Sequence, residues 1–305
     1  MKKWKIYLTF LGVLLVLAGC SLPGLASNDD EDTISITGGI TSEAQILGSI
    51  VAGMVEHYTD KNATVINNLA TTTINHQAMM NGDASISAAR YTGTDLTTTL
   101  GLEAEKDPAT AFDIVKREFE KRYDQTWFPS YGFDNTFVFL VRKDTAEKYH
   151  LSKVSDLKNV ADSLSAGVDT AWITRAGDGY DGFQETYGFS FQSILPMQIG
   201  LVYDAVQAGK MDIVLGYSTD GRIASYDLVM LEDDLHFFPP YDAAPVVDNQ
   251  LLKNTPGLEE ALSKLAGTID TKKMQQLNYE ADNDLVEPSV VAERFLKENH
   301  YFEGK

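Results

Sequence analysis

Cysteine is almost absent from this chain of 305 residues, in which Cys20 is the single example. A lone cysteine cannot close an internal disulfide, so no cross-link of that kind stabilises the fold. The five histidines are scattered and form neither an HExxH motif nor a Cys/His cluster, which argues against a zinc site. GxSxG and Walker motifs are also missing. The sequence therefore offers no motif for catalysis, and no cofactor or metal is expected.

Positive charge is scarce as well. The chain has 25 Lys and Arg residues against 44 Asp and Glu, giving a formal net charge of −19. So acidic a surface argues against nucleic acid as a partner and against an anionic ligand attracted by the overall field. It is compatible with a cationic or zwitterionic ligand. The alternative interpretation of the charge is simple solubility beside a cell surface.

Long apolar runs are limited to the N-terminus. Three lysines among the first five residues precede an apolar run at residues 6–17, and Leu-Ala-Gly-Cys follows, ending at Cys20. The run is short for a bilayer span, and small residues before a cysteine are typical of a signal peptide with a lipobox. The pattern predicts a signal peptide at residues 1–19 and lipidation of Cys20, as in bacterial lipoproteins. An uncleaved anchor would leave the protein on the same side of the membrane.

The folded body is expected to begin near Thr33. Residues 20–32, rich in Ser, Gly, Asn and acidic residues, are typical of a flexible spacer. The remaining chain of roughly 270 residues is long enough for two lobes with a sizeable core. We predict lobe I at residues 33–127 and 234–305, and lobe II at residues 128–233.

Short strands alternate with helices along this body. An apolar stripe at helical spacing predicts a helix from about Ser42, and Asp107-Pro108 predicts the start of a long helix that ends near Tyr123. Further helices are predicted near residues 181–187, 200–208, 256–266, 271–279 and 288–299. Strands are predicted near residues 33–37, 63–67, 83–90, 136–141 and 211–216. This alternation is typical of an α/β fold, and we expect mostly parallel strands.

Tyrosines stand where two of these strands end. Tyr217 follows the apolar run at residues 211–216 and precedes the turn sequence Ser-Thr-Asp-Gly. Tyr91 occupies the same position after the strand at residues 83–90. In open α/β sheets such strand ends border the ligand crevice, so both rings could face a cleft. The alternative for each is a half-buried core tyrosine.

Several motifs carry a family resemblance. They are YTGT from Tyr91, YGFDNT from Tyr131, WITRAGDGY from Trp172, YGF from Tyr187, YSTDGRI from Tyr217 and FFPPYD from Phe237. From about Thr33 to the C-terminus, the sequence resembles the substrate-binding proteins of osmoprotectant ABC importers. Members of that family are lipoproteins that deliver glycine betaine, choline or carnitine.

The resemblance implies a type II periplasmic-binding-protein fold with a ligand cleft between two lobes. It implies an aromatic cage formed by Tyr91 and Tyr241 from one lobe and by Phe137 and Tyr217 from the other, with Thr94 also at the ligand. The chemistry fits such a cage, since a trimethylammonium group has no N–H to donate and spreads its charge over methyl groups. Ring faces offer it apolar contact and cation–π attraction.

Two positions depart from the family pattern. Position 137 is usually tyrosine, and Phe137 keeps the ring face without the hydroxyl. Some members have a glutamine that helps to hold the ligand carboxylate where this chain has Gly38-Gly39, so a carboxylate would rely on Thr94 or backbone N–H groups. Choline, or a bulkier zwitterion such as carnitine, would suit the change. An aspartate at position 94 would favour a purely cationic ligand, so the neutral Thr94 favours a betaine-type zwitterion.

Other residues of these motifs have structural interpretations. Arg175 is expected to pair with Asp178 more than to touch ligand. Asp134 and Asn135 could order the start of the strand at residues 136–141. The acidic pair that begins at Asp233 is expected to lie on a solvated face.

These inferences predict an extracellular, lipid-anchored substrate-binding protein without enzymatic activity, on the outer face of the cytoplasmic membrane of a Gram-positive bacterium. A monomer is expected, with the ABC permease and its ATPase on separate chains. One alternative is a sensory or adhesion lipoprotein on the same fold, because fold does not fix function. Another is a lipid-anchored enzyme acting on a choline-type amine, for which a nucleophile–base pair is missing.

Overall fold

The computed structural model describes residues 32–175 and 177–303. The predicted signal peptide, the lipidation site Cys20 and nearly all of the spacer lie outside these residues. The site described below belongs to the compact unit that begins at Ile34. Within the described ranges, none of the helices combines the length and the apolar character needed to cross a membrane.

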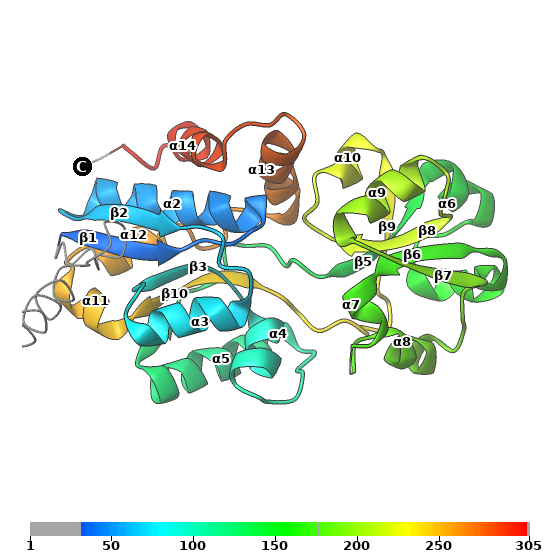
Figure 1. The fold of residues 1–305 in the computed structure, drawn as a ribbon, viewed down its shortest axis with the longest axis horizontal. Coiled ribbons are helices and arrows are strands. Elements are labelled where there is room, and N and C mark those ends of the chain that lie inside the picture. Colours follow the sequence, from blue (N-terminus) through cyan, green and yellow to red (C-terminus); the bar gives the residue numbers. More distant parts are fainter. Residues whose placement is uncertain (1–31, 176, 304–305) are drawn as a thin grey trace, which may run out of the picture. The chain divides into compact units, whose positions relative to one another are not determined.

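The first sheet has five strands in the order β2-β1-β3-β10-β4 (Figure 1). Their bounds are β1 Thr33–Thr37, β2 Asn62–Ile66, β3 Ile86–Tyr91, β4 Gln125–Trp127 and β10 Ala243–Asp248. Strand β1 runs parallel to β3, whereas β10 runs antiparallel to both β3 and β4. A strand from late in the chain therefore lies inside a sheet begun at its start.

The second sheet also has five strands, in the order β7-β6-β8-β5-β9. Their bounds are β5 Phe137–Arg142, β6 Ser165–Asp169, β7 Ser193–Met197, β8 Ile213–Tyr217 and β9 Leu228–Leu231. Strand β6 is parallel to β7 and β8, and β5 is antiparallel to β8 and β9.

Both sheets are thus mixed. The expectation of mostly parallel strands holds in part, since β1 and β3, and β6, β7 and β8, run parallel, whereas one strand in each sheet is reversed. The reversed strands are β5 and β10, which are the first strands that the chain forms after leaving the other sheet. A strand that enters from a neighbouring sheet does not follow a helical crossover, so nothing forces it to run parallel to its partners.

Helices begin where the sequence places their caps. Helix α2 (Ser42–Tyr58) is capped by Thr41, whose hydroxyl accepts from Ala44 N at 3.2 Å. Helix α5 (Pro108–Tyr123) is capped by Asp107, which accepts from Thr110 N at 2.8 Å. Both starts confirm the predictions, because a short polar side chain satisfies a free N–H of the first turn.

The remaining helices cover the sheets (Figure 1). They are α3 Thr72–Asn81, α4 Thr92–Thr94, α6 Lys143–Tyr149, α7 Thr170–Ile173, α8 Tyr180–Tyr187, α9 Ile199–Gln207, α10 Arg222–Ser225, α11 Asn249–Asn254, α12 Leu258–Ser263, α13 Thr271–Asp282 and α14 Pro288–Glu298. Irregular helical turns are η1 Asp95–Thr99, η2 Val154–Asn159 and η3 Ala161–Ser163. The helix predicted at 256–266 is shorter than expected, and α13 is longer.

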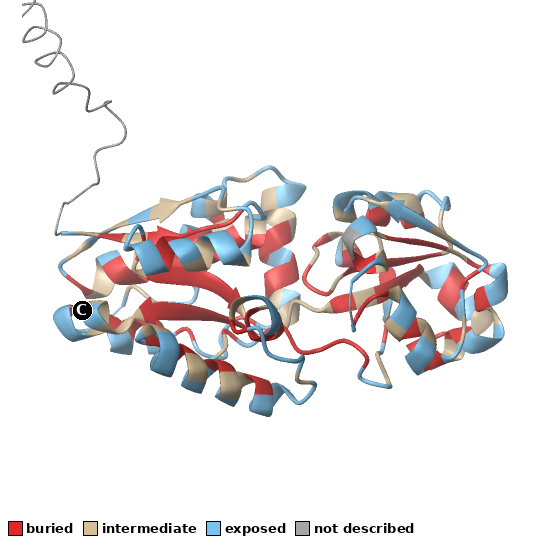
Figure 2. Cartoon of the chain, turned by 60° about the horizontal axis from the view of Figure 1, so that its bottom comes forward, coloured by how far each residue is buried: buried red, intermediate tan, exposed pale blue. Residues whose placement is uncertain are grey.

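Each sheet has its own core, and the strands are largely buried while the helices expose their outer faces (Figure 2). Phe128 and Tyr131 pack in the cluster of the first sheet. Phe237 packs in the cluster of the second. The lobe limits at residues 127 and 233 remain a prediction, and this packing favours crossings several residues further along the chain.

Candidate functional site

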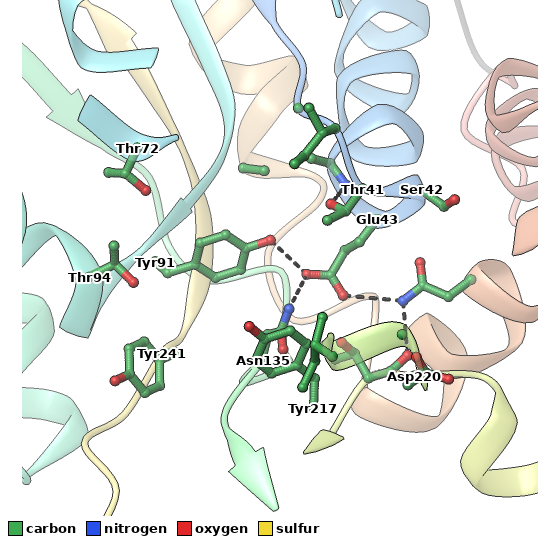
Figure 3. Close-up of a pocket in the computed structure, with 18 of the residues that line it drawn as sticks. Thr41, Ser42, Glu43, Thr72, Tyr91, Thr94, Asn135, Tyr217, Asp220 and Tyr241 are labelled. Carbon is green, nitrogen blue, oxygen red and sulfur yellow. Dashed lines mark hydrogen bonds between the residues drawn. The ribbon is translucent and has the colours of Figure 1, made fainter. Parts of the chain in front are cut away.

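A cavity of about 490 Å³ is lined by elements of both sheets. Its size lies within the range of small-molecule sites. The five ligand-binding residues expected from the sequence all line this cavity: Tyr91, Thr94, Phe137, Tyr217 and Tyr241. All of them except Phe137 are labelled in Figure 3. The structure therefore brings together five residues that are spread over 151 positions of the chain, from 91 to 241.

The second sheet supplies Phe137 and Tyr217 as direct neighbours. The two residues face each other in the antiparallel pair of β5 and β8, and their ring centroids lie 5.3 Å apart. Phe137 also contacts Phe238 at 5.6 Å between centroids. Because cross-strand side chains on one face lie close together, the register of the two strands sets this pair of rings. Burial raises the pKa of Tyr217, with a smaller contribution from the charge of Asp169, so its phenol stays neutral.

The first sheet supplies Tyr91 and Tyr241. Tyr91 ends β3 opposite Ala243 of β10, and Tyr241 lies two residues before that partner. Gly93 donates its N–H to Pro240 O at 3.0 Å. A Cβ atom at Gly93 would lie 2.5 Å from Pro240 O and 3.2 Å from the Tyr241 ring, so glycine is needed for this close approach. The Tyr241 ring meets Phe137 edge-on, with centroids 6.5 Å apart.

Polar groups hold Tyr241 in place. Its hydroxyl donates to Asp178 Oδ2 at 2.8 Å and accepts from Arg175 Nη2 at 2.8 Å. Its backbone N–H donates to Asp134 Oδ1 at 2.8 Å. Burial raises the pKa of Tyr241, and the charge of Asp178 raises it further.

The expected pairing of Arg175 with Asp178 is confirmed, with Nε to Oδ1 at 2.7 Å. Arg175 also lines the cavity, and its Cζ lies 5.7 Å from the centroid of the Phe137 ring. Sequence reasoning gave the pairing and missed this position at the cavity wall.

Asp134 and Asn135 organise the approach to β5, in keeping with the role expected for them. Asp134 O accepts from the Ser218 hydroxyl at 2.7 Å, and that hydroxyl oxygen in turn accepts from Thr136 N at 3.1 Å. Burial raises the pKa of the Asp134 carboxyl to about 7. The Asn135 side chain points to another carboxylate of the cavity.

That carboxylate is Glu43, the second residue of α2, which sequence reasoning missed. Its side chain accepts hydrogen bonds from Tyr91 Oη at 2.6 Å, Asn135 Nδ2 at 2.8 Å and Asn278 Nδ2 at 3.2 Å (Figure 3). Only 4% of Glu43 is exposed. Burial raises the pKa of Tyr91 well above its ordinary value, and the Glu43 charge raises it further. The sequence signal was ambiguous, because an acid in a first helical turn is also an ordinary partner of the helix dipole.

Gly39 and Thr94 also belong to the cavity wall. Gly39 lines the cavity, and a Cβ atom there would lie 2.7 Å from the Cβ of Ala44 on α2. A larger residue at this position would therefore require α2 to shift. Thr94 ends α4 at the side of the cavity that carries Tyr91 and Tyr241 (Figure 3).

Asp233 does not lie on a solvated face, and that expectation is wrong. Its carboxylate accepts the backbone N–H groups of Phe237 at 3.0 Å and Phe238 at 2.8 Å, and also the Tyr187 hydroxyl. A carboxylate can accept hydrogen bonds from several N–H groups of a tight turn, and this explains an aspartate at position 233. Asp233 thereby shapes the segment that leads to Tyr241.

The two mixed sheets, with a cavity lined from both, define a ligand-binding protein of the type II periplasmic-binding-protein fold. The family model described as the substrate binding domain of ABC-type glycine betaine transport systems matches residues 32–298. The chain therefore belongs to this family.

Individual relatives agree with that assignment. The carnitine transport binding protein OpuCC of Listeria monocytogenes is 51% identical, over 99% of each chain. A glycine-betaine-binding protein of Pseudomonas aeruginosa is 30% identical, over 94% of this chain and 93% of its own. A crystal structure described as a glycine betaine/carnitine/choline ABC transporter is 51% identical, with a TM-score of 0.85 over 88% of this chain and all of that one.

Proposed function

We propose that this protein captures a quaternary-ammonium compatible solute in an aromatic cage and delivers it to an ABC permease for osmoprotection. The cage consists of Tyr91, Phe137, Tyr217 and Tyr241. One observation carries the proposal: four aromatic residues line a single cavity of about 490 Å³, two from each sheet.

The chemistry of a trimethylammonium group suits these rings. Each ring face that the group contacts contributes about 0.5 to 2 kcal/mol of cation–π attraction, in addition to apolar contact. Phe137 serves as well as a tyrosine in this role because the attraction comes from its face. Since rings from both sheets contact the same group, ligand binding favours the state in which the two halves of the site approach each other.

The ligand class that we favour is a betaine-type zwitterion, and carnitine is the first candidate. Thr94 offers a neutral hydroxyl beside the cage for the ligand carboxylate. The carnitine-binding relative with 51% identity supports this choice, and choline remains the cationic alternative.

The same proposal places the protein on the outer face of the cytoplasmic membrane, anchored through lipidated Cys20. Its permease and ATPase would be separate chains, and the protein itself would be a monomer without catalytic activity. The two lobes would be residues 33–127 with 234–305, and residues 128–233. Membership of a family of transport proteins supports this assignment.

Calorimetric titration of the full-length protein tests the proposal. A maltoside detergent is suitable because it carries no quaternary ammonium group. We expect binding of carnitine or glycine betaine, weaker binding of proline, and loss of at least about tenfold in affinity in Tyr217→Ala and in Tyr241→Ala.

Circular dichroism of both variants provides the control for folding. Absence of binding to carnitine, glycine betaine and choline, in a folded wild-type protein, would overturn the proposal. A sensory or adhesion role on the same fold would then replace it.

A further inference from the structure

Glu43 differs from the other acids near the cage in its pairing. Asp178 pairs with Arg175 at 2.7 Å, and Asp220 pairs with Arg222 at 2.8 Å. The three donors to Glu43 are a phenol and two carboxamides, all of them neutral. None of the ion pairs found in the described part of the chain includes Glu43.

Burial makes this difference important. Only 4% of Glu43 is exposed, and a buried carboxylate is costly unless hydrogen bonds and an opposite charge compensate for lost hydration. The neutral donors around Glu43 supply the hydrogen bonds, which are one of these two compensating factors. Among the described residues, the side chains hydrogen-bonded to Glu43 carry no positive charge, and a cationic ligand head in the same cavity would supply it.

Glu43 is hydrogen-bonded to one ring of the cage and, through two asparagines, to the backbone beside other rings. It accepts directly from Tyr91. Asn135 donates its backbone N–H to Tyr241 O at 3.2 Å and stands two residues before Phe137. Asn278 donates to Thr219 O at 2.9 Å, two residues after Tyr217. One carboxylate thus links the supports of rings from both sheets.

We propose that Glu43 is a positioning and specificity-determining residue: its buried carboxylate fixes the cage and selects ligands with a cationic head over isosteric uncharged heads. This inference rests on the proposed function, because it concerns the ligand of the same cavity. A role limited to the dipole of α2 or to local hydrogen bonding would not distinguish ligands by the charge of their heads.

A pair of ligands that differ in one atom separates these roles. Glycine betaine and 3,3-dimethylbutanoate have the same shape, and carbon replaces the charged nitrogen in the second. Their affinities are measured by calorimetric displacement of carnitine from the full-length protein. In Glu43→Gln we expect the affinity for glycine betaine to fall by about tenfold or more, since a fixed opposite charge is lost. The affinity for 3,3-dimethylbutanoate should stay the same or rise.

Glu56→Gln is the matched control. Glu56 lies on the same helix, is exposed and does not line this cavity. It lies thirteen positions further along the helix than Glu43, a distance of about 20 Å. The substitution changes net charge equally, so it should leave the affinities for both ligands within about twofold of wild type.

A second variant keeps Glu43 in place. Asn278→Lys would put an ammonium beside Glu43 Oε2 and neutralise it internally. Like Glu43→Gln, it should reduce the ratio of the affinity for glycine betaine to the affinity for 3,3-dimethylbutanoate. If Glu43→Gln does not fold, Asn278→Lys tests whether the charge of Glu43 selects cationic ligand heads.

The outcomes are distinct. Unchanged affinities in the folded Glu43→Gln variant, or equal weakening for both ligands, would overturn the role of Glu43 in selection and leave the proposed function standing. A wild-type protein that binds no quaternary amine would remove both proposals.

Discussion

The two halves of the cavity hold their rings in different ways. On the second sheet, Phe137 and Tyr217 are neighbours across paired strands, and ring packing fixes them. On the first sheet, Tyr91 and Tyr241 are fixed by hydrogen bonds to buried carboxylates, Glu43 and Asp178. We call these the packed half and the polar half of the site.

The difference teaches where the site tolerates change. Packing depends on the shape of a ring, so we expect the packed half to tolerate the loss of a hydroxyl. Hydrogen bonds act on single atoms, and leaving a buried partner unsatisfied costs about 1 to 3 kcal/mol. We therefore expect the polar half to be sensitive to the removal of one oxygen or the addition of one methyl group.

The largest effect is expected from Asp134→Asn, in the polar half. Burial raises the pKa of Asp134 to about 7 from 3.8. A carboxyl with a higher pKa in the folded state stabilises the fold fully below about pH 4, and this contribution is lost as the pH rises through 7. Asparagine keeps an oxygen for Tyr241 N–H and does not titrate. Relative to the variant, wild type should lose at most about 4 kcal/mol of unfolding free energy between pH 4 and 8.

Urea unfolding at a series of pH values measures this difference. The half-buried position of Asp134 makes the figure an upper bound. Parallel pH profiles of the two proteins would show that Asp134 has an ordinary pKa.

Gly93→Ala is expected to cost about 1 to 3 kcal/mol, because the added Cβ would lie 2.5 Å from Pro240 O. It would also push on the Tyr241 ring, so the affinity for carnitine should fall by about tenfold. Thermal unfolding and calorimetry measure the two effects. Gly200→Ala is the control for stability, since no atom lies within 4 Å of its added Cβ and alanine favours the helix. A stable Gly93→Ala protein with full affinity would contradict the tight contact.

Tyr91→Phe should cost about 1 to 2 kcal/mol of stability, because Glu43 loses the donor at 2.6 Å. The ring face remains, so we expect carnitine affinity to fall only a few-fold. Chemical unfolding and titration of the same protein test both values. A stability equal to wild type would mean that the polar half does not depend on this hydroxyl.

Tyr217→Phe is expected to have the smallest effect, below about 0.5 kcal/mol. Among the described residues, the Tyr217 hydroxyl takes part in none of the hydrogen bonds found, and its ring would still pack on Phe137 at 5.3 Å. Carnitine affinity should stay within about twofold. If Tyr217→Phe lowers stability as much as Tyr91→Phe does, the packed half and the polar half do not differ in the way described.

Local chemistry made much of the fold predictable from the sequence. The starts of α2 and α5 follow from Thr41 and Asp107, since caps depend only on nearby residues. Tyr91 and Tyr217 stand at strand ends because apolar runs stop there. The five cavity residues were selected mainly through the family resemblance.

What the sequence did not reveal depends on contacts between distant segments. The direction of β5 and β10 follows from passages between sheets, which no local pattern encodes. Glu43 meets Asn135 and Asn278, which are 92 and 235 positions away. The role of Asp233 similarly depends on the path of the chain that follows it.

The position of β10 in the first sheet has a consequence for folding. All strands of the second sheet lie between residues 137 and 231, so that sheet can complete its pairing from one continuous stretch of chain. The first sheet cannot, because β3 and β4 are joined through β10, which is made after the whole second sheet. Its closure is a late, long-range event with a high loop-closure cost. When the chain is formed from its N-terminus, the second sheet can therefore be complete before β10, the inner strand of the first sheet, is available for pairing.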